Sequence, residues 1–400
     1  MSLASGRPYL AIPGPSVIPD RVLRAMHRGS PNIYEGPLIE MVASLWPDLR
    51  MVAGTTGHVA MYIGNGHGGW EAANANLFSR GEKALVLATG RFGLSWAESA
   101  RAMGIEVEVL DFGRSSPVDF DRVEAALRDD AGHRIKAVLT THVDTASSIK
   151  TDIPALRAAM DAAGHPALLA VDCIASLGCD EFRMDDWGVD VMVAACQKGL
   201  MTPPGLAFVW FSETARLRCG HSDLATPYWA WGPRAQPEDF WQHWDGTAPT
   251  NHLYGLREAL DMLREEGMPQ VWHRHHTLAR TVWAAFDAWG AGNPQIGLNV
   301  ADPVHRGWSV TAARFGAPHA TRLREWCETR AGVTLGIGLG MAASTEPAYH
   351  GFLRVGHMGH VNAHMTLGAL AVMEAGLVAL DIPHGVGALA AAAGVIARNA

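Results

Sequence analysis

A glycine-rich stretch, an aspartate and a lysine are the residues whose types and spacing could do chemistry together in this chain. Gly64, Gly66 and Gly69 have the spacing G-x-G-x-x-G, between a predicted strand over 58–63 and a helix expected to start near Gly69. Because the N–H groups at the start of a helix bind anions, this stretch predicts a phosphate site. A tight turn that only needs small residues is the alternative.

The same glycine spacing occurs in dinucleotide-binding turns, which would make the protein a nicotinamide-dependent oxidoreductase. Such a turn needs an acidic residue about 20 positions further on, at the end of the next strand, to bind a ribose. The next predicted strand, over 84–88, is followed by Thr89 and Gly90 instead of a carboxylate. We therefore expect a phosphate site of another kind and keep the oxidoreductase as an alternative from a different class.

Asp172 and Lys198 follow two neighbouring predicted strands. Asp172 ends the apolar run 166–171, where a carboxylate is costly unless it has a partner. Lys198 follows the apolar run 189–195 and precedes a loop with two prolines and a glycine. Partial burial there would lower the pKa of the lysine and favour imine formation. A structural ion pair between the two residues is the alternative interpretation.

Taken together, these features match the needs of pyridoxal phosphate. The lysine would form the imine, the aspartate would keep the pyridine nitrogen protonated, and the helix N-terminus would take the phosphate. A metal site is not expected. The three histidines at 273, 275 and 276 have offsets that do not place them on one helix face.

The elements that must position these residues alternate between apolar strands and helices from about residue 57 to residue 210. Near-continuous apolar runs are typical of a parallel sheet with helices on both faces. A long helical stretch follows over about 250–290, with a break at Gly267, and a mixture of strands and helices begins near residue 296. The predicted domains are an N-terminal segment over 1–30 that packs across the others, a large α/β domain over 31–285 and a small α+β domain over 286–400.

The composition is that of a large folded protein. Of 400 residues, 48% are apolar and 18% are charged, which allows a large core and two domains. A net charge of −8 without a basic block disfavours nucleic acid as a partner. The five cysteines lack metal-binding spacing and are expected to be reduced thiols. With no signal peptide and no uninterrupted apolar span evident, we expect a cytoplasmic protein without a membrane partner.

The chain resembles the class V aminotransferases of the serine–glyoxylate and alanine–glyoxylate type. The resemblance lies in "GGWEAA", "VDCIASLG", "QKGLMTPPGL" and "LRVGHMG", and it extends over nearly the whole chain. It implies a pyridoxal-phosphate-dependent transferase of fold type I, an α/β protein with a mostly parallel seven-stranded sheet in the large domain and a smaller C-terminal α+β domain. It also implies a homodimer with shared active sites that acts on small amino acids and 2-oxo acids.

The resemblance further implies roles for single residues. Lys198 would be the Schiff-base lysine and the catalytic base, Asp172 the partner of the pyridine nitrogen, and Arg354 the ligand of the substrate α-carboxylate. Further cofactor contacts would come from Gly66, His67 and Gln197 at the phosphate, Phe92 and Ile174 at the ring faces, Thr145 at the ring hydroxyl, and Thr247 and Trp244 near the phosphate, Thr247 reaching that of the other subunit. Gly14 and Tyr34 would join Arg354 in the substrate site.

The expected reaction is transfer of the amino group of serine to glyoxylate, which gives glycine and a 2-oxo acid. Alanine or aspartate as the donor is a close alternative. The stretch "NIYEGP" over 32–37 departs from the polar run that lines the substrate site in relatives. This departure motivates a further alternative, transfer from pyridoxamine to pyruvate.

Overall fold

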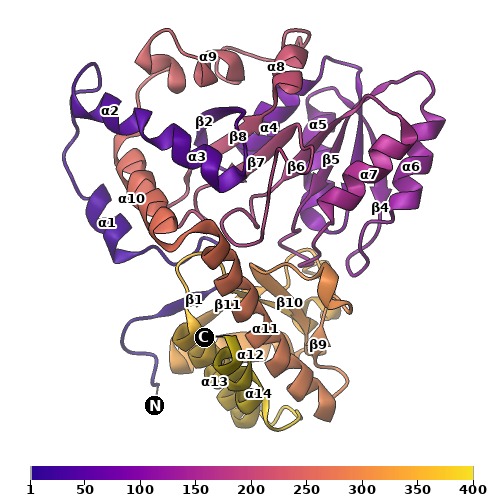
Figure 1. The fold of residues 1–400 in the computed structure, drawn as a ribbon. Helices are drawn as coiled ribbons and strands as arrows, with labels where there is room; N and C mark the ends of the chain where they lie inside the picture. Colours follow the sequence, from indigo (N-terminus) through magenta and orange to yellow (C-terminus); the bar gives the residue numbers. More distant parts are fainter. Residues whose placement is uncertain (1, 400) are drawn as a thin grey trace.

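A seven-stranded sheet forms the middle of the larger part of the molecule, as shown by a computed structural model that describes residues 2–399 (Figure 1). Its strands are β2 (His58–Gly64), β3 (Lys83–Ala88), β4 (Glu106–Asp111), β5 (Ile135–Thr141), β6 (Leu168–Asp172), β7 (Val191–Ala195) and β8 (Gly205–Phe211). They lie in the order β2-β8-β7-β6-β5-β3-β4, and only the two pairs that include β8 are antiparallel. The expected mostly parallel seven-stranded sheet is confirmed.

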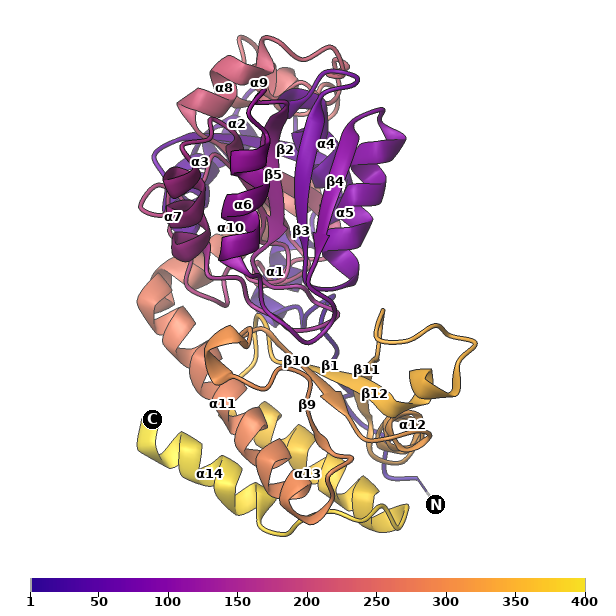
Figure 2. The same ribbon diagram turned by 90° about the vertical axis from the view of Figure 1, so that its right-hand side faces the viewer.

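Helices cover both faces of this sheet. They are α1 (Asp20–Met26), α2 (Pro37–Ala43), α3 (Leu45–Ala53), α4 (Gly66–Leu77), α5 (Arg91–Ala102), α6 (Phe120–Asp129), α7 (Ile153–Ala163), α8 (Glu213–Cys219), α9 (Trp231–Ala235) and α10 (Thr250–Glu266). Along β3, Leu85 and Leu87 face a core with α3, α6, α7 and α10, whereas Ala84 and Val86 face a core with α4, α5, α8 and α9. Figure 2 shows α6 and α7 on one side of the strands and α5 on the other. Burial on both faces explains the continuous apolar runs.

A second, smaller sheet with its own helices makes up the remainder of the molecule. Its strands are β1 (Tyr9–Ala11), β9 (Gly297–Leu298), β10 (Val310–Arg314), β11 (Val333–Ile337) and β12 (Phe352–Gly356), and its helices are α11 (Met268–Gly292), α12 (His319–Ala331), α13 (Ala363–Ala379) and α14 (Ala388–Asn399). The strand order is β1-β11-β12-β10-β9, and a separate apolar core joins this sheet to the four helices (Figure 2). The expected smaller α+β part is confirmed.

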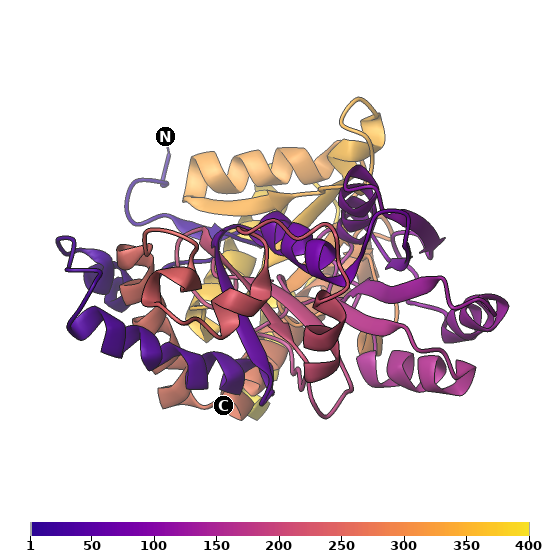
Figure 3. The same ribbon diagram turned by 90° about the horizontal axis from the view of Figure 1, so that it is seen from above.

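The N-terminal segment belongs to both parts. β1 pairs in parallel with β11 of the smaller sheet, while α1 packs against α10. Figure 3 shows the N-terminal helices in indigo beside α10 in salmon at one flank. Gly267 separates α10 from α11 at the predicted break, but the division proposed at residue 285 falls inside α11, which is continuous. Every helix within residues 2–399 is too short or too polar to cross a lipid bilayer.

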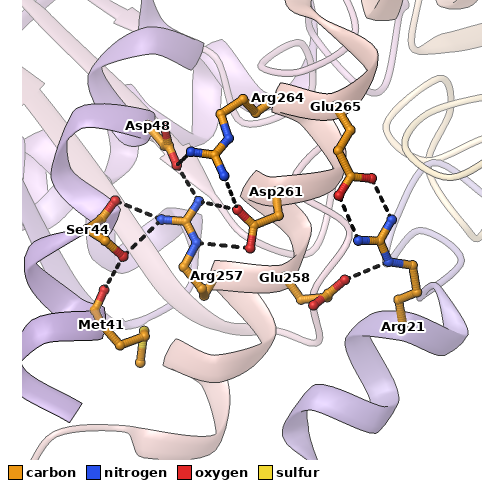
Figure 4. Close-up of polar contacts among 9 residues, drawn as sticks. All are labelled: Arg21, Met41, Ser44, Asp48, Arg257, Glu258, Asp261, Arg264 and Glu265. Atoms are coloured by element: carbon orange, nitrogen blue, oxygen red, sulfur yellow. Dashed lines mark hydrogen bonds and ion pairs between the residues drawn. The ribbon is translucent and has the colours of Figure 1, made fainter. Parts of the chain in front are cut away.

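Ion pairs fasten the N-terminal helices to α10 (Figure 4). Arg21 on α1 donates to Glu258 at 2.6 Å and, through both η nitrogens, to Glu265 at 2.7 and 2.9 Å. Arg257 on α10 binds Asp48 on α3, and both side chains are mostly shielded from water. Shielding reduces screening, so removing one partner of this pair leaves a poorly hydrated charge.

Replacing Arg257 by alanine should therefore destabilise the fold by about 2 kcal/mol, because the shielded Asp48 carboxylate would lose its close partner and keep only Arg264, at 3.9 Å. Thermal unfolding of Arg257→Ala against the unmodified protein measures the effect. The control is Arg7→Ala, which breaks an ion pair with Asp20 whose side chains are 75% and 55% exposed and should cost well under about 1 kcal/mol. Equal melting temperatures for the two variants would contradict the assigned weight of the α3–α10 contact.

Candidate active site

Asp172 is the last residue of β6, at the carboxyl edge of the parallel strands, and it is only 4% exposed. Its Oδ1 accepts a hydrogen bond from the Ile174 N–H at 2.7 Å, and its Oδ2 accepts one from the Trp70 indole at 3.1 Å. Burial raises the pKa of Asp172 to about 7, with the nearby charge of Asp144 adding to the rise and the two donors opposing it. The carboxyl group is therefore poised to change its ionisation near neutral pH.

Lys198 lies in the turn between β7 and β8, and β7 is the strand next to β6. Its Nζ donates to the Pro13 carbonyl at 2.5 Å, and the Ser16 hydroxyl donates to the Lys198 carbonyl at 2.7 Å. Burial lowers the pKa of Lys198 to about 8, with the positive charge of Arg354 adding to the decrease and Asp172 opposing it. A substantial fraction of this amine is therefore neutral, and nucleophilic, near pH 8.

Gly14 lies directly against the lysine side chain. A Cβ atom at this position would overlap the end of Lys198, and the backbone φ of +89° is in the region that favours glycine. The N-terminal loop thus touches the amine, which agrees with the predicted place of Gly14 in the substrate site and leaves its contact with a substrate as a proposal.

The glycine-rich stretch forms the start of α4. The helix begins at Gly66, one turn earlier than the expected start near Gly69, because Asn65 caps it by accepting hydrogen bonds from the His67 and Gly68 N–H groups at 3.1 and 3.3 Å. The N–H of Gly66, at the N-terminal end of α4, is not used by this cap and can therefore bind an anion. Gly66 is also packed so closely against Ile174 that a Cβ atom would overlap that side chain.

Phe92 and Thr145 are joined through a residue that the sequence analysis missed. The Asp144 carboxylate accepts a hydrogen bond from the Phe92 N–H at 2.8 Å, and Asp144 directly precedes Thr145, which is buried. Trp70 was missed as well. For Asp144, the available signal was that an acidic residue comes just after the apolar run that becomes β5, the same rule that identified Asp172.

Arg354 comes from the smaller sheet, in β12, and reaches towards the carboxyl edge of the large one. Its Nη1 donates to the Thr145 carbonyl at 2.9 Å and its Nε donates to the Ile337 carbonyl at 2.8 Å. Burial lowers the pKa of Arg354 to about 10, with Asp144 opposing the decrease. Only 6% of the residue is exposed, and these two bonds leave the Nη2 donors for a ligand.

Three predicted residues lie apart from this group in the single chain. Tyr34 is 86% exposed and Thr247 is also exposed, so both side chains face solvent. Trp244 is 1% exposed and packs against Phe240 with ring centroids 5.1 Å apart. The Trp244 indole N–H has no hydrogen-bond partner among residues 2–399, and its contact with the cofactor stays a prediction.

The residues that do converge fit a phosphorylated pyridine aldehyde. Asp172 offers an acceptor for a ring N–H, Lys198 offers an amine of lowered pKa, and the N-terminal end of α4 offers a site for a phosphate. The Gln197 side-chain oxygen and the Thr89 hydroxyl are buried without a hydrogen-bond partner among residues 2–399. Unsatisfied buried polar groups are costly, so they indicate a polar ligand beside them.

Comparison with known proteins agrees with this chemistry. The family model described as "Aminotransferase class-V" matches residues 61–367. The chain is 36% identical to the serine–glyoxylate aminotransferase of Methylorubrum extorquens over 385 residues, which covers 93% of this chain and 92% of that protein. It is 35% identical to the L-aspartate–glyoxylate aminotransferase of Paracoccus denitrificans over 394 residues, which covers 96% and 94%.

A solved structure with the same fold is that of pyridoxamine–pyruvate aminotransferase from Mesorhizobium loti. It matches with a TM-score of 0.88 at 24% identity and covers 100% of both chains. The ureidoglycine–glyoxylate aminotransferase from Bacillus subtilis matches with a TM-score of 0.85, also at 24% identity, and covers 99% of this chain and 100% of that one. Together with the family match, these comparisons place the chain in the class V aminotransferases, pyridoxal-phosphate-dependent enzymes of fold type I.

Proposed function

We propose that the protein transfers the amino group of a small L-amino acid, serine in the first place, to glyoxylate, with pyridoxal 5'-phosphate held through Lys198. The observation that carries this proposal is the buried pair of Asp172 and Lys198, whose pKa values burial moves towards each other, to about 7 and about 8. The names of the relatives support glyoxylate as the acceptor, since two that are at least 35% identical are glyoxylate aminotransferases.

The chain's residues divide the work between holding and proton transfer. When bound, pyridoxal phosphate supplies an electron sink for the electrons of the substrate Cα–H bond. The Asp172 carboxylate would accept the ring N–H. The Gly66 N–H, His67 and Gln197 would hold the phosphate, with Phe92 and Ile174 at the ring faces and Thr145 at the ring hydroxyl. Lys198, as a neutral amine, would remove the α-proton and return it.

Arg354 is the residue best placed to recognise the α-carboxylate of the substrate. A buried guanidinium whose Nη2 donors and second Nη1 N–H are unused is suited to a carboxylate, which it can bind by two parallel hydrogen bonds, one from each nitrogen. The aspartate–glyoxylate relative makes aspartate a second candidate donor beside alanine. Transfer from pyridoxamine to pyruvate is a third candidate, because the stretch 32–37 departs from the polar run expected there.

A homodimer with shared sites is part of the same proposal. Thr247, His67 and Tyr34 are exposed in the single chain. A second copy that covers these residues would bring the Thr247 hydroxyl to the phosphate of its neighbour and Tyr34 to the substrate. Two-fold symmetry would then give each dimer two equivalent sites.

The substrate assignment is tested by steady-state rates with serine, alanine, aspartate and pyridoxamine, each with glyoxylate and with pyruvate. We expect the highest kcat/KM for serine with glyoxylate, and no turnover in Lys198→Ala, which lacks the amine that moves the proton. Pyridoxamine with pyruvate as the best pair would overturn the substrate assignment and leave the enzyme class intact. Comparable turnover in Lys198→Ala would overturn the role of the lysine.

The lowered pKa of Lys198 predicts how fast the cofactor-free protein takes up pyridoxal phosphate at different pH values. Only the neutral amine attacks the aldehyde, so the rate of attachment should rise with pH through a midpoint near 8. Stopped-flow absorbance measures this rate. Arg354→Gln removes a nearby positive charge and should move the midpoint upward. A midpoint near the ordinary lysine value of about 10.4 in the unmodified protein would contradict the burial of the amine.

Shared sites are tested by mixing two variants that are each inactive alone, Lys198→Ala and Thr247→Asp. In a shared-site dimer, Thr247→Asp would place a carboxylate against the partner's phosphate. A mixed dimer would then hold one site with an intact Lys198 and an intact Thr247, so activity should return to about a quarter of the wild-type value. Activity no higher than the sum of the two variants would show that Thr247 does not serve the partner's site.

A further inference from the structure

Asp144 is a fully buried carboxylate at the carboxyl edge of the large sheet, and the roles in cofactor and substrate binding assigned above do not include it. It follows β5 and lies in the loop that carries Thr145. Both of its oxygens accept hydrogen bonds from main-chain N–H groups, the pattern expected of an ionised carboxylate. The four donors are Phe92 at 2.8 Å, Gly93 at 3.2 Å, Ala146 at 2.9 Å and Ser147 at 3.4 Å.

The first pair of hydrogen bonds anchors the carboxylate to α5. Oδ2 accepts from the N–H groups of Phe92 and Gly93 in the first turn of this helix, where a negative charge is favoured. Gly90 makes the close approach possible, because a Cβ atom there would lie 2.6 Å from the Asp144 Cγ. Asp144 is thus held by a helix that covers the large sheet.

The second pair shapes the loop that meets Arg354. Oδ1 accepts from the N–H groups of Ala146 and Ser147, which closes a turn around Thr145. The main-chain carbonyl of Thr145 accepts a hydrogen bond from Arg354 Nη1 at 2.9 Å. The orientation of this carbonyl, and therefore of the guanidinium, depends on the turn that the carboxylate closes.

Charge acts in the same direction as geometry. Burial lowers the pKa of Arg354, and the negative charge of Asp144 opposes that decrease, which favours the cationic form that binds an anion. Burial also raises the pKa of Asp144 itself, and its four N–H donors oppose the rise. The carboxylate therefore supports the charge of Arg354 without contacting it.

We propose that Asp144 is a positioning residue for the substrate's α-carboxylate: anchored on α5, it fixes the Thr145 carbonyl that orients the Arg354 guanidinium. This inference rests on the proposed role of Arg354 as the carboxylate ligand. It places the determinant of amino acid recognition on the large domain, although the arginine itself comes from the smaller sheet. Loss of Asp144 should then weaken the recognition of the carboxylate and spare the reaction of an amine that has none.

The experiment compares L-serine with ethanolamine, which is serine without its carboxylate. Single-turnover loss of the cofactor's visible absorbance is measured in wild-type enzyme loaded with pyridoxal phosphate and in Asp144→Asn. In Asp144→Asn we expect the second-order rate constant for serine to fall at least about tenfold, mainly through weaker binding. That for ethanolamine should change less than about threefold, because only serine uses the guanidinium.

Asp190→Asn is the matched control. Asp190 also accepts a main-chain hydrogen bond, from Leu169 at 2.9 Å, but it precedes β7 at the opposite edge of the sheet. This variant should leave the ratio between serine and ethanolamine unchanged. If Asp144→Asn does not fold, Gly90→Ala provides the same test, because its Cβ atom would displace the Asp144 carboxylate without removing it.

Equal losses for serine and ethanolamine would overturn the proposal and show that Asp144 only stabilises the fold. A second test adds Asp144→Asn to Arg354→Lys, where it should cause little further loss for serine because the two residues act as a unit. Fully additive losses would also overturn the proposal. If Arg354→Lys alone leaves the serine reaction unchanged, the failure lies with the proposed carboxylate site instead of with Asp144.

Discussion

Burial of a carboxyl group and an amine at the ends of two adjacent strands is the constraint on which the whole site depends. Removal from water raises the pKa of Asp172 to about 7 and lowers that of Lys198 to about 8, so each can exchange a proton near neutral pH. β6 and β7 are neighbouring parallel strands, with Asp172 at the end of β6 and Lys198 in the turn that follows β7. The Trp70 indole and the Pro13 carbonyl supply fixed partners in place of water.

The second constraint is that the two parts of the molecule must meet at this edge. The N-terminal segment adds β1 to the smaller sheet and then crosses the lysine, where Ser16 binds the Lys198 carbonyl and Gly14 leaves room for the amine. Arg354 extends to the same place from β12 and donates a hydrogen bond to the Thr145 carbonyl, which lies at the carboxyl edge of the large sheet. The proton-transfer groups and the carboxylate-binding group therefore come from different sheets.

The parts of this arrangement that depend on local pattern could be predicted from the sequence. Apolar runs located the strands, and a charge at the end of a run identified Asp172 and Lys198. The pairing of β1 with β11 could not be predicted, because it joins residues more than 300 positions apart. The place of Asp144 just after the apolar run of β5 could have marked it as a candidate, but the four main-chain donors that define its role are brought together only in the folded chain. The burial of Trp244 could not be predicted either, because it depends on tertiary packing.

The most direct measurement is borohydride reduction of the protein loaded with pyridoxal phosphate, followed by peptide mapping. The chain has only four lysines, at positions 83, 136, 150 and 198, so the modified residue can be identified without ambiguity. The account predicts loss of the visible absorbance and a stable pyridoxyl group on Lys198 alone. Label distributed over the other three lysines, or none on Lys198, would contradict it.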